Sequence, residues 1–89
     1  MIVFESLTVG ATVIGLSSSV YETAQFTAKT AIITVEDEPI RYRIDGTAPG
    51  DGHEGIENDV MELCTIEEIR NFRAVRSGAS DSAIKVTYQ

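Results

Sequence analysis

The side chains able to carry out nucleophilic or acid–base chemistry are few in this chain of 89 residues. His53 is its only histidine and Cys64 its only cysteine, and together they could in principle form a thiol–imidazole pair. Zinc would find at most these two soft ligands, where it needs several. His53 is expected to hold its own loop by a hydrogen bond, and Cys64, in a strand-like run, to be a small buried apolar residue. We therefore predict that the protein is not an enzyme.

Carboxylates are concentrated between residues 45 and 59, in a segment that also holds several glycines. Such a cluster could supply the six to eight oxygen ligands that Ca²⁺ takes, and Ca²⁺ binding by the loop 51–59 stays open. The spacing is not that of an EF-hand, so a solvated acidic loop is the expected arrangement. The phosphate-binding pattern G-x-x-x-x-G-K-[ST] is absent, and the negative charge of the loop would repel phosphate. We predict no catalytic, cofactor or metal site. The acids are Asp45, Asp51, Glu54, Glu57 and Asp59.

The overall charge excludes two classes of partner. Fourteen acidic residues against seven lysines and arginines give a formal net charge of -7. A protein that tracks a nucleic-acid backbone needs a positive surface, and adsorption to anionic membranes needs one too. We therefore predict neither nucleic acid nor membrane as a partner. A single cysteine excludes an intramolecular disulfide, and the N-terminus lacks the basic region of a signal peptide. We expect one domain, residues 1–89, made in the cytoplasm.

The stretch from Pro39 to Pro49 carries the clearest strand signal in the sequence, with a signal for its start and another for its end. Ile40, Tyr42 and Ile44 alternate with Arg41 and Arg43, which is the period of a half-buried strand. A proline suits the first residue of a strand, and an Asp-Gly pair supplies a turn after it. The residues expected to structure the following loop, 47–58, are Asp45, Gly46, Pro49 and His53.

The remaining segments predict further short strands and one helix. Strands are expected at 2–9, 12–16, 60–65, 72–76 and 83–88. Residues 17–19 are expected to form a loop, and residues 20–28 a loop or an irregular edge strand. The β-branched run at 29–35 predicts a strand buried on both faces, joined by a hairpin at 36–39 to the strand 40–45. Thr65 and Glu68 fit a capping box, which predicts a short helix near residues 66–71.

Short strands with closely spaced turns and one helical segment are typical of an all-β protein. We predict a compact antiparallel β-sandwich, immunoglobulin-like or jelly-roll-like, with six to eight strands. Its small core favours association with further copies. The apolar side chains expected in the core are Phe4, Ile33, Val35, Ile40, Tyr42, Ile44, Leu63, Phe72, Ile84 and Val86.

Three arginines are candidates for contact with a partner. Arg41 and Arg43 share the polar face of their strand, and Arg73 follows on a nearby strand, so the three could form a cationic stripe on an acidic protein. Arginine is enriched in interfaces because its planar group pairs well with carboxylates. The alternative is that these arginines pair across strands with the chain's own acids. Those acids are Glu36, Glu38 and Glu62.

Three segments carry a resemblance to a known group of proteins. The segments 36–49 (EDEPIRYRIDGTAP), 52–53 (GH) and 71–79 (NFRAVRSGA) resemble small virion proteins of tailed bacteriophages, with the likeness spanning roughly residues 29–89. In that group the order is an I-R-Y-R-x-D-G-T-A-P segment, a G-H pair, a short helical turn, an R-F-R-A-x-R-x-G-like strand and a last strand ending in tyrosine. Gly50 and Asp51 alter the usual loop before the G-H pair, which leaves the role of that loop open.

The resemblance implies a structural protein of the phage particle. It implies a compact β-sandwich that serves as a head decoration (cement) protein on the major capsid protein, or as a tail or baseplate accessory protein, and it transfers no catalytic residue. The expected location is the virion. Together with the small core it favours a homo-oligomer, and a trimer would suit the local three-fold positions of a capsid.

A shorter likeness suggests a rival function. The Y-x-x-D-G-x-x-P arrangement from Tyr42 to Pro49 is similar to one in immunoglobulin-like accessory domains of bacterial glycoside-processing enzymes. An adhesive or carbohydrate-binding module would expose tyrosines such as Tyr21, Tyr42 or Tyr88 as a platform. The usual platform residue, tryptophan, is absent. The likeness therefore supports the sandwich more than it supports a sugar site.

Overall fold

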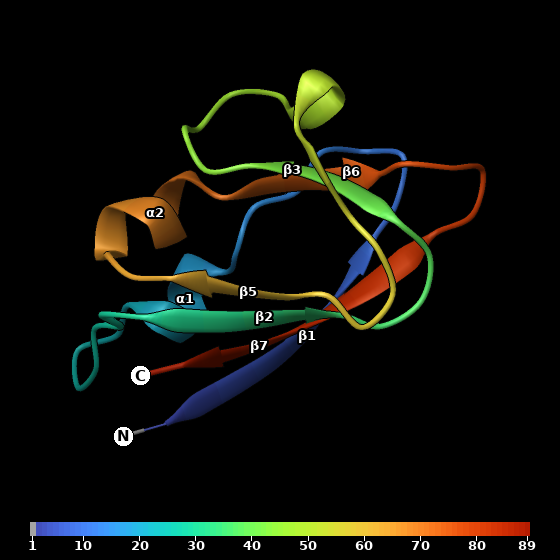
Figure 1. Cartoon of the computed structure of the whole chain (residues 1–89). Coiled ribbons are helices and arrows are strands. Elements are labelled where there is room, and N and C mark those ends of the chain that lie inside the picture. Colours follow the sequence, from blue (N-terminus) through green and yellow to red (C-terminus); the bar gives the residue numbers. More distant parts are fainter. Residues whose placement is uncertain (1) are drawn as a thin grey trace.

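The structure, a computed structural model, consists of two antiparallel sheets packed face to face (Figure 1). It describes residues 2–89, apart from the side chain of Asp51. Seven strands and two short α-helices occur in this part of the chain, which confirms the predicted all-β sandwich. The elements are β1 (Val3–Val9), α1 (Ser18–Tyr21), β2 (Ala31–Val35), β3 (Ile40–Arg43), the 3-10 turn η1 (Pro49–Asp51), β4 (His53–Gly55), β5 (Val60–Leu63), α2 (Ile66–Asn71), β6 (Arg73–Arg76) and β7 (Ser82–Tyr88).

The four-stranded sheet has the order β1-β7-β2-β5, and the three-stranded sheet has the order β4-β3-β6. The first and last strands pair along their whole length, from Val3 opposite Tyr88 to Val9 opposite Ser82. The two ends of the chain therefore lie side by side (Figure 1). β7 also pairs with β2, so it lies inside the sheet, and its alternate residues Ile84, Val86 and Tyr88 are buried.

The predicted hairpin between residues 29–35 and 40–45 is wrong, because β2 and β3 belong to different sheets. The end of β2 is already hydrogen-bonded elsewhere. The N–H of Val35 donates to the carbonyl of Asp59 at 3.0 Å, and its carbonyl accepts from the N–H of Asn58 at 2.8 Å. The N–H of Glu36 donates to the carbonyl of Ala83 at 2.9 Å. These backbone groups are therefore not available to β3, and residues 36–39 carry the chain from one layer to the other.

The core between the sheets contains most of the predicted residues. Ile33, Ile40 and Phe72 are fully buried, but Phe4 is 57% exposed and Ile44 is 40% exposed. These two predictions are wrong, and Tyr42 is only partly buried. Further core residues that the sequence did not predict are Val9, Leu16, Tyr21, Ala28, Ala31, Ile69, Ala74 and Tyr88.

The face of β1 that points inward carries a carboxylate. Val3, Glu5 and Leu7 are partly buried along this strand, whereas the residues between them are exposed. Glu5 accepts hydrogen bonds from the hydroxyl of Tyr88 and from the N–H of Ser17, which precedes α1. Desolvation in the core, reinforced by this carboxylate, raises the pKa of Tyr88 above its ordinary value. Residues of β1 therefore alternate between the two faces as predicted, but the set that points inward is the one that contains Glu5.

The segment before β2 differs from its prediction. The strand expected at 12–16 is reduced to one bridge, in which Ile14 and Ala74 exchange two backbone hydrogen bonds of 2.9 Å. Residues 18–21 form α1 instead of a loop, and the ring of Tyr21 packs against Tyr88 with the ring centroids 5.7 Å apart. The prediction that β2 is buried on both faces is wrong. Ile32 is 37% exposed because no element covers the outer face of its sheet in the described residues.

The predicted helix near residues 66–71 is confirmed as α2. The hydroxyl of Thr65 accepts a hydrogen bond of 3.1 Å from the N–H of Glu68, as a capping residue should. The Glu68 carboxylate reaches back to the N–H of Cys64 at 2.7 Å, one residue before the cap. Ile69 is buried, and the helix ends at Phe72, whose ring enters the core.

Phe4 and Phe72, both predicted from the sequence to be in the core, should respond differently to truncation. We expect Phe72→Ala to lower the free energy of unfolding by about 3–5 kcal/mol, because it opens a cavity between the sheets. Phe4→Ala, the matched control, should cost less than about 1 kcal/mol, since that ring already contacts water. Urea denaturation monitored by circular dichroism measures both values. Equal losses would contradict the assignment of Phe4 to the outer face.

Candidate functional site

The three predicted partner-contact arginines lie on the outer face of the three-stranded sheet. Ile40 and Tyr42 point toward the core, so Arg41 and Arg43 point outward. In the pairing of β3 with β6, Arg43 is directly opposite Arg73. We call these three residues the arginine face. The register places the three residues on one face of the sheet, and their contact with a partner stays a prediction.

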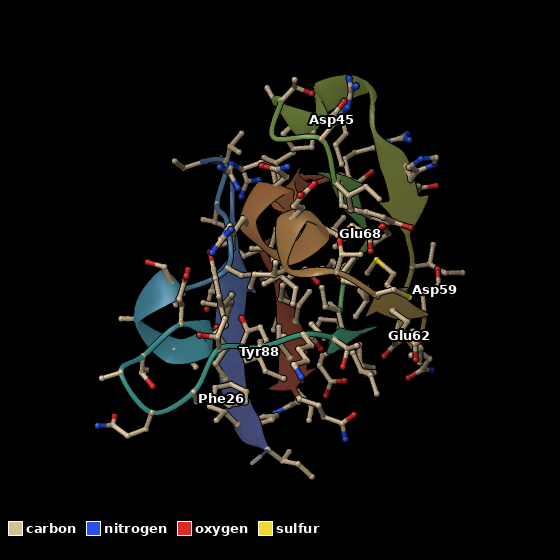
Figure 2. The ribbon with its side chains drawn as sticks, turned by 90° about the vertical axis from the view of Figure 1, so that its left-hand side faces the viewer. Phe26, Asp45, Asp59, Glu62, Glu68 and Tyr88 are labelled. Carbon is tan, nitrogen blue, oxygen red and sulfur yellow. The ribbon has the colours of Figure 1, made fainter. Side chains whose placement is uncertain are left out.

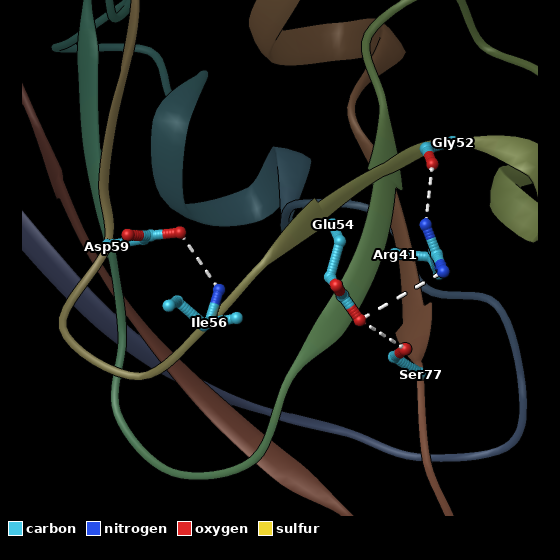
Figure 3. A network of polar contacts seen from close by, with 6 residues as sticks. All are labelled: Arg41, Gly52, Glu54, Ile56, Asp59 and Ser77. Atoms are coloured by element: carbon cyan, nitrogen blue, oxygen red, sulfur yellow. Dashed lines mark hydrogen bonds and ion pairs between the residues drawn. The ribbon is translucent and has the colours of Figure 1, made fainter.

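These arginines are held by local groups rather than by the acids expected from the sequence. Arg41 forms an ion pair with Glu54 at 4.0 Å and donates to the carbonyl of Gly52 at 3.3 Å, and Glu54 also accepts from Ser77 (Figure 3). Arg43 pairs with Asp45. Because the side chains of Arg41 and Glu54 are 41% and 44% exposed, their pair contributes little to stability.

Arg73 is the member of this face without a carboxylate partner among the described residues. Its guanidinium donates to the carbonyls of Arg70 and Phe72, at 2.9 and 2.8 Å. Arg73 is opposite Arg43 in the sheet, but Arg43 is paired with Asp45, and the guanidinium of Arg73 lies beside Gly15, where an added Cβ atom would be 2.9 Å from Nη1. Arg73 is therefore the one arginine of this face whose charge no carboxylate among the described residues compensates.

The loop that follows β3 is organised by Asp45. Its carboxylate accepts from the N–H and the hydroxyl of Thr47, at 3.2 and 2.7 Å, and from Arg43. These hydrogen bonds, Thr47 first and then Arg43, lower the pKa of Asp45 from 3.8 to about 2. Gly46 adopts a φ of 81°, which favours glycine, and its N–H donates to the carbonyl of Asn71 at 2.9 Å. Pro49 is buried and begins η1.

The expected long loop 47–58 also contains a strand that the sequence did not predict. β4 pairs with the edge of β3, with His53 opposite Tyr42. A Cβ atom added to Gly52 would lie 2.3 Å from the carbonyl oxygen of Tyr42, so only glycine fits this approach. The imidazole of His53 packs beside the Tyr42 ring, 5.6 Å between centroids, and makes no side-chain hydrogen bond within the described residues.

An open cleft of about 330 Å³ separates the edges of the two sheets next to His53. Its other walls come from Tyr42, Ile44 and β5, and a smaller hollow of about 140 Å³ continues toward Arg43 and Asp45. Cys64 is not part of either lining. It is exposed, which corrects the expectation of a buried residue. Desolvation and then the charges of Glu62 and Glu68 raise the pKa of its thiol, so the thiolate needed for nucleophilic attack is disfavoured.

The clustered acids are spread over separate local structures. Asp45 and Asp59 lie apart in the molecule, and Asp59 accepts from the N–H of Ile56 at 2.9 Å (Figures 2 and 3). Glu54 is paired with Arg41. Among the described side chains, which do not include that of Asp51, no three or more histidine, cysteine or acidic residues are arranged to hold a metal ion. No helix in residues 2–89 is long and apolar enough to cross a membrane.

No protein-family model matches the chain, and the searches of curated proteins and of solved structures found no match either.

Two neighbouring glycines offer a test of the close approach between β3 and β4. We expect Gly52→Ala to lower the free energy of unfolding by about 3 kcal/mol or more, because its methyl group would overlap the backbone of Tyr42. Gly50→Ala is the matched control, since nothing lies within 4 Å of its Cβ position. Thermal unfolding of both variants measures the difference. A Gly52→Ala protein as stable as the control would show that β4 does not pair as described.

Asp45 should remain ionised at lower pH than an ordinary aspartate. Its pKa is lowered by folding, so the contribution of its hydrogen bonds is present above the ordinary value and is lost as the pH falls from about 4 to about 2. Thr47→Val removes the hydroxyl donor, and we expect the pKa of Asp45 to move back toward 3.8. NMR titration of the carboxyl carbons measures the shift, with Thr8→Val as control. An unchanged pKa would contradict the role assigned to Thr47.

Proposed function

We propose that the protein is a non-enzymatic structural component of a bacteriophage particle, and specifically a capsid decoration (cement) protein located in the virion. The observation that carries the proposal is that two segments resembling phage virion proteins, separate in the sequence, lie side by side in the structure. The segments around Arg41 and Arg73 are about thirty residues apart in the chain, yet they form the neighbouring strands β3 and β6. The outward side chains of both segments together make the arginine face.

The distribution of charge supports docking through this face. The chain has a net charge of -7, whereas on this face Arg41 and Arg43 are balanced by Glu54 and Asp45 and Arg73 has no carboxylate partner among the described residues. An acidic shell would therefore be repelled less by this face than by the rest of the chain. Complementary potentials of this kind select an orientation and speed encounter more than they add affinity. The proposed partner is therefore the major capsid protein, presenting carboxylates to the outer side of β3 and β6. Self-association of the chain is the second part of the proposal.

Two alternatives use different observations. A tail or baseplate accessory protein would use the same arginine face, and only the identity of the partner separates it from a head protein. A carbohydrate-binding or adhesive module would need exposed aromatic rings. Tyr21 and Tyr88 are buried and pack on each other, and Tyr42 is partly buried against Phe72, with ring centroids 6.0 Å apart. This arrangement favours the virion protein over the module.

Binding of the purified protein to empty capsids should depend on the arginine face. We expect Arg41→Glu, Arg43→Glu and Arg73→Glu each to weaken binding at least about ten-fold, because each places a carboxylate where a partner's carboxylate docks. Lys29→Glu makes the same charge change away from this face and should bind like the unaltered chain. Co-sedimentation with capsids and with tails measures the affinities.

Mass spectrometry of purified particles gives the second measurement. Presence in the virion with binding to heads supports the proposal, and binding to tails alone selects the accessory alternative. Absence from the particle together with no binding to heads or tails would overturn both. Binding that is insensitive to all three arginine variants would overturn the assignment of the docking face.

A further inference from the structure

The outer face of the four-stranded sheet differs in character from the rest of the molecule. Three of the large apolar side chains exposed among the described residues lie on it, at 57% for Phe4, 37% for Ile32 and 65% for Val60. Figure 1 shows no further element beyond this sheet on the side away from β3 and β6. We call it the neutral face. Its residues are Phe4, Ser6, Thr8, Ile32, Thr34, Val60, Glu62, Ala83, Lys85 and Thr87.

The neutral face carries almost none of the chain's excess negative charge. Of its ten residues only Lys85 and Glu62 are charged, and their charges cancel. The whole chain has a net charge of -7, so two copies repel each other through most of their surfaces. This face is therefore one where two copies can approach without a net repulsion.

The register makes the neutral face complementary to itself. One row across the sheet contains Phe4, Thr87, Ile32 and Glu62, and the next contains Ser6, Lys85, Thr34 and Val60. Lys85 on β7 and Glu62 on β5 therefore lie on the two sides of the inner strand β2. A two-fold axis running across β2 between them would place Lys85 of each copy against Glu62 of the other. Ile32 would then lie near the axis, beside its own equivalent.

We propose that the neutral face binds a second copy of the chain and forms a two-fold dimer. An interface that pairs the same patch on both copies closes as a dimer, in contrast to the trimer considered from the sequence. The proposal rests on the self-association part of the proposed function and is independent of any phage partner. In the single chain, the ammonium group of Lys85 lies 5.7 Å from the centre of the Phe4 ring, and it is within reach of a partner's carboxylate.

The size of the face sets the strength of the contact. Four strands about 4.8 Å apart, each contributing about 15–23 Å of length, make a flat area on the order of 400 Å². This is at the low end for protein interfaces, which typically bury about 800 Å² on each partner. The dimer should therefore be in equilibrium with the monomer, in the micromolar to millimolar range of concentration.

Sedimentation equilibrium over that concentration range tests the dimer directly. We expect Ile32→Glu to weaken dimerisation at least about ten-fold, because two carboxylates would meet near the axis. Val13→Glu is the matched control, since Val13 is an exposed apolar residue outside this face, and it should leave the equilibrium unchanged. Circular dichroism of both variants verifies that the fold is retained.

Charge exchange tests the two-fold pairing itself. Lys85→Glu and Glu62→Lys should each weaken self-association, because each creates two like-charged pairs in the dimer. An equimolar mixture of these two variants should associate as the unaltered chain does. In the mixed dimer the carboxylate introduced at position 85 of one variant meets the ammonium group introduced at position 62 of the other, and the remaining native pair is kept.

Three outcomes would overturn the proposal. The chain could stay monomeric up to millimolar concentration, it could form a trimer, or it could dimerise regardless of these substitutions. Because no capsid enters the experiment, its failure is separate from failure of the virion role.

Discussion

The backbone of Val35 is the point on which the arrangement of the two sheets depends. Both its N–H and its carbonyl are bound to residues 58–59 of the turn between β4 and β5. Asn58 adopts a φ of 72° there, and the carboxylate of Asp59 closes the turn on the N–H of Ile56. The side chain of Val35 packs beneath Gly55, where an added Cβ atom would be 3.3 Å away. One residue thus anchors the end of β2 and the whole β4–β5 connection.

This anchor determines which strands become edges. β4 is held at the edge of the three-stranded sheet and β5 at the edge of the four-stranded sheet, so the cleft beside His53 opens between them. Each sheet buries one face against the other. The outer face of the four-stranded sheet is left uncovered by the described elements, whereas η1 lies against β3 and β6 on the outer side of the three-stranded sheet (Figure 1). Those two outer faces have different chemistry, one with three arginines and the other nearly uncharged. Because the two outer faces differ in charge, each face suits a different kind of partner surface.

Alternation along a strand is the clearest signal in the sequence, and it predicted most of the strands and the shared face of Arg41 and Arg43. It defines which residues share a face, but it does not say which face is inward. In β1 the inward face contains Glu5, whose carboxylate is satisfied by the Tyr88 hydroxyl and the Ser17 N–H, both distant in sequence. The pattern alone therefore places Phe4 in the core. The capping box identified α2 because its donors and acceptors are only three or four residues apart.

The features that the sequence did not reveal depend on contacts between distant residues. A short polar turn at 36–39 indicates that two strands are near each other, but not that both belong to one sheet. The hydrogen bonds of Val35 to residues 58–59 decide that, and nothing local encodes them. β4 was not predicted because the glycines and acids in and around it have the composition of a loop. Gly52 is required there by the space beside the Tyr42 carbonyl rather than by its own φ.

The opposite placement of the two outer faces constrains how they can be used together. If two copies pair through the neutral face, their arginine faces point away from each other on the two sides of the dimer. A flat capsid surface can then contact only one of them. The second arginine face of a docked dimer remains free for another acidic surface, or else the second copy is released when the first one binds. Self-association and docking are therefore linked by the geometry of the sandwich, although they use separate residues.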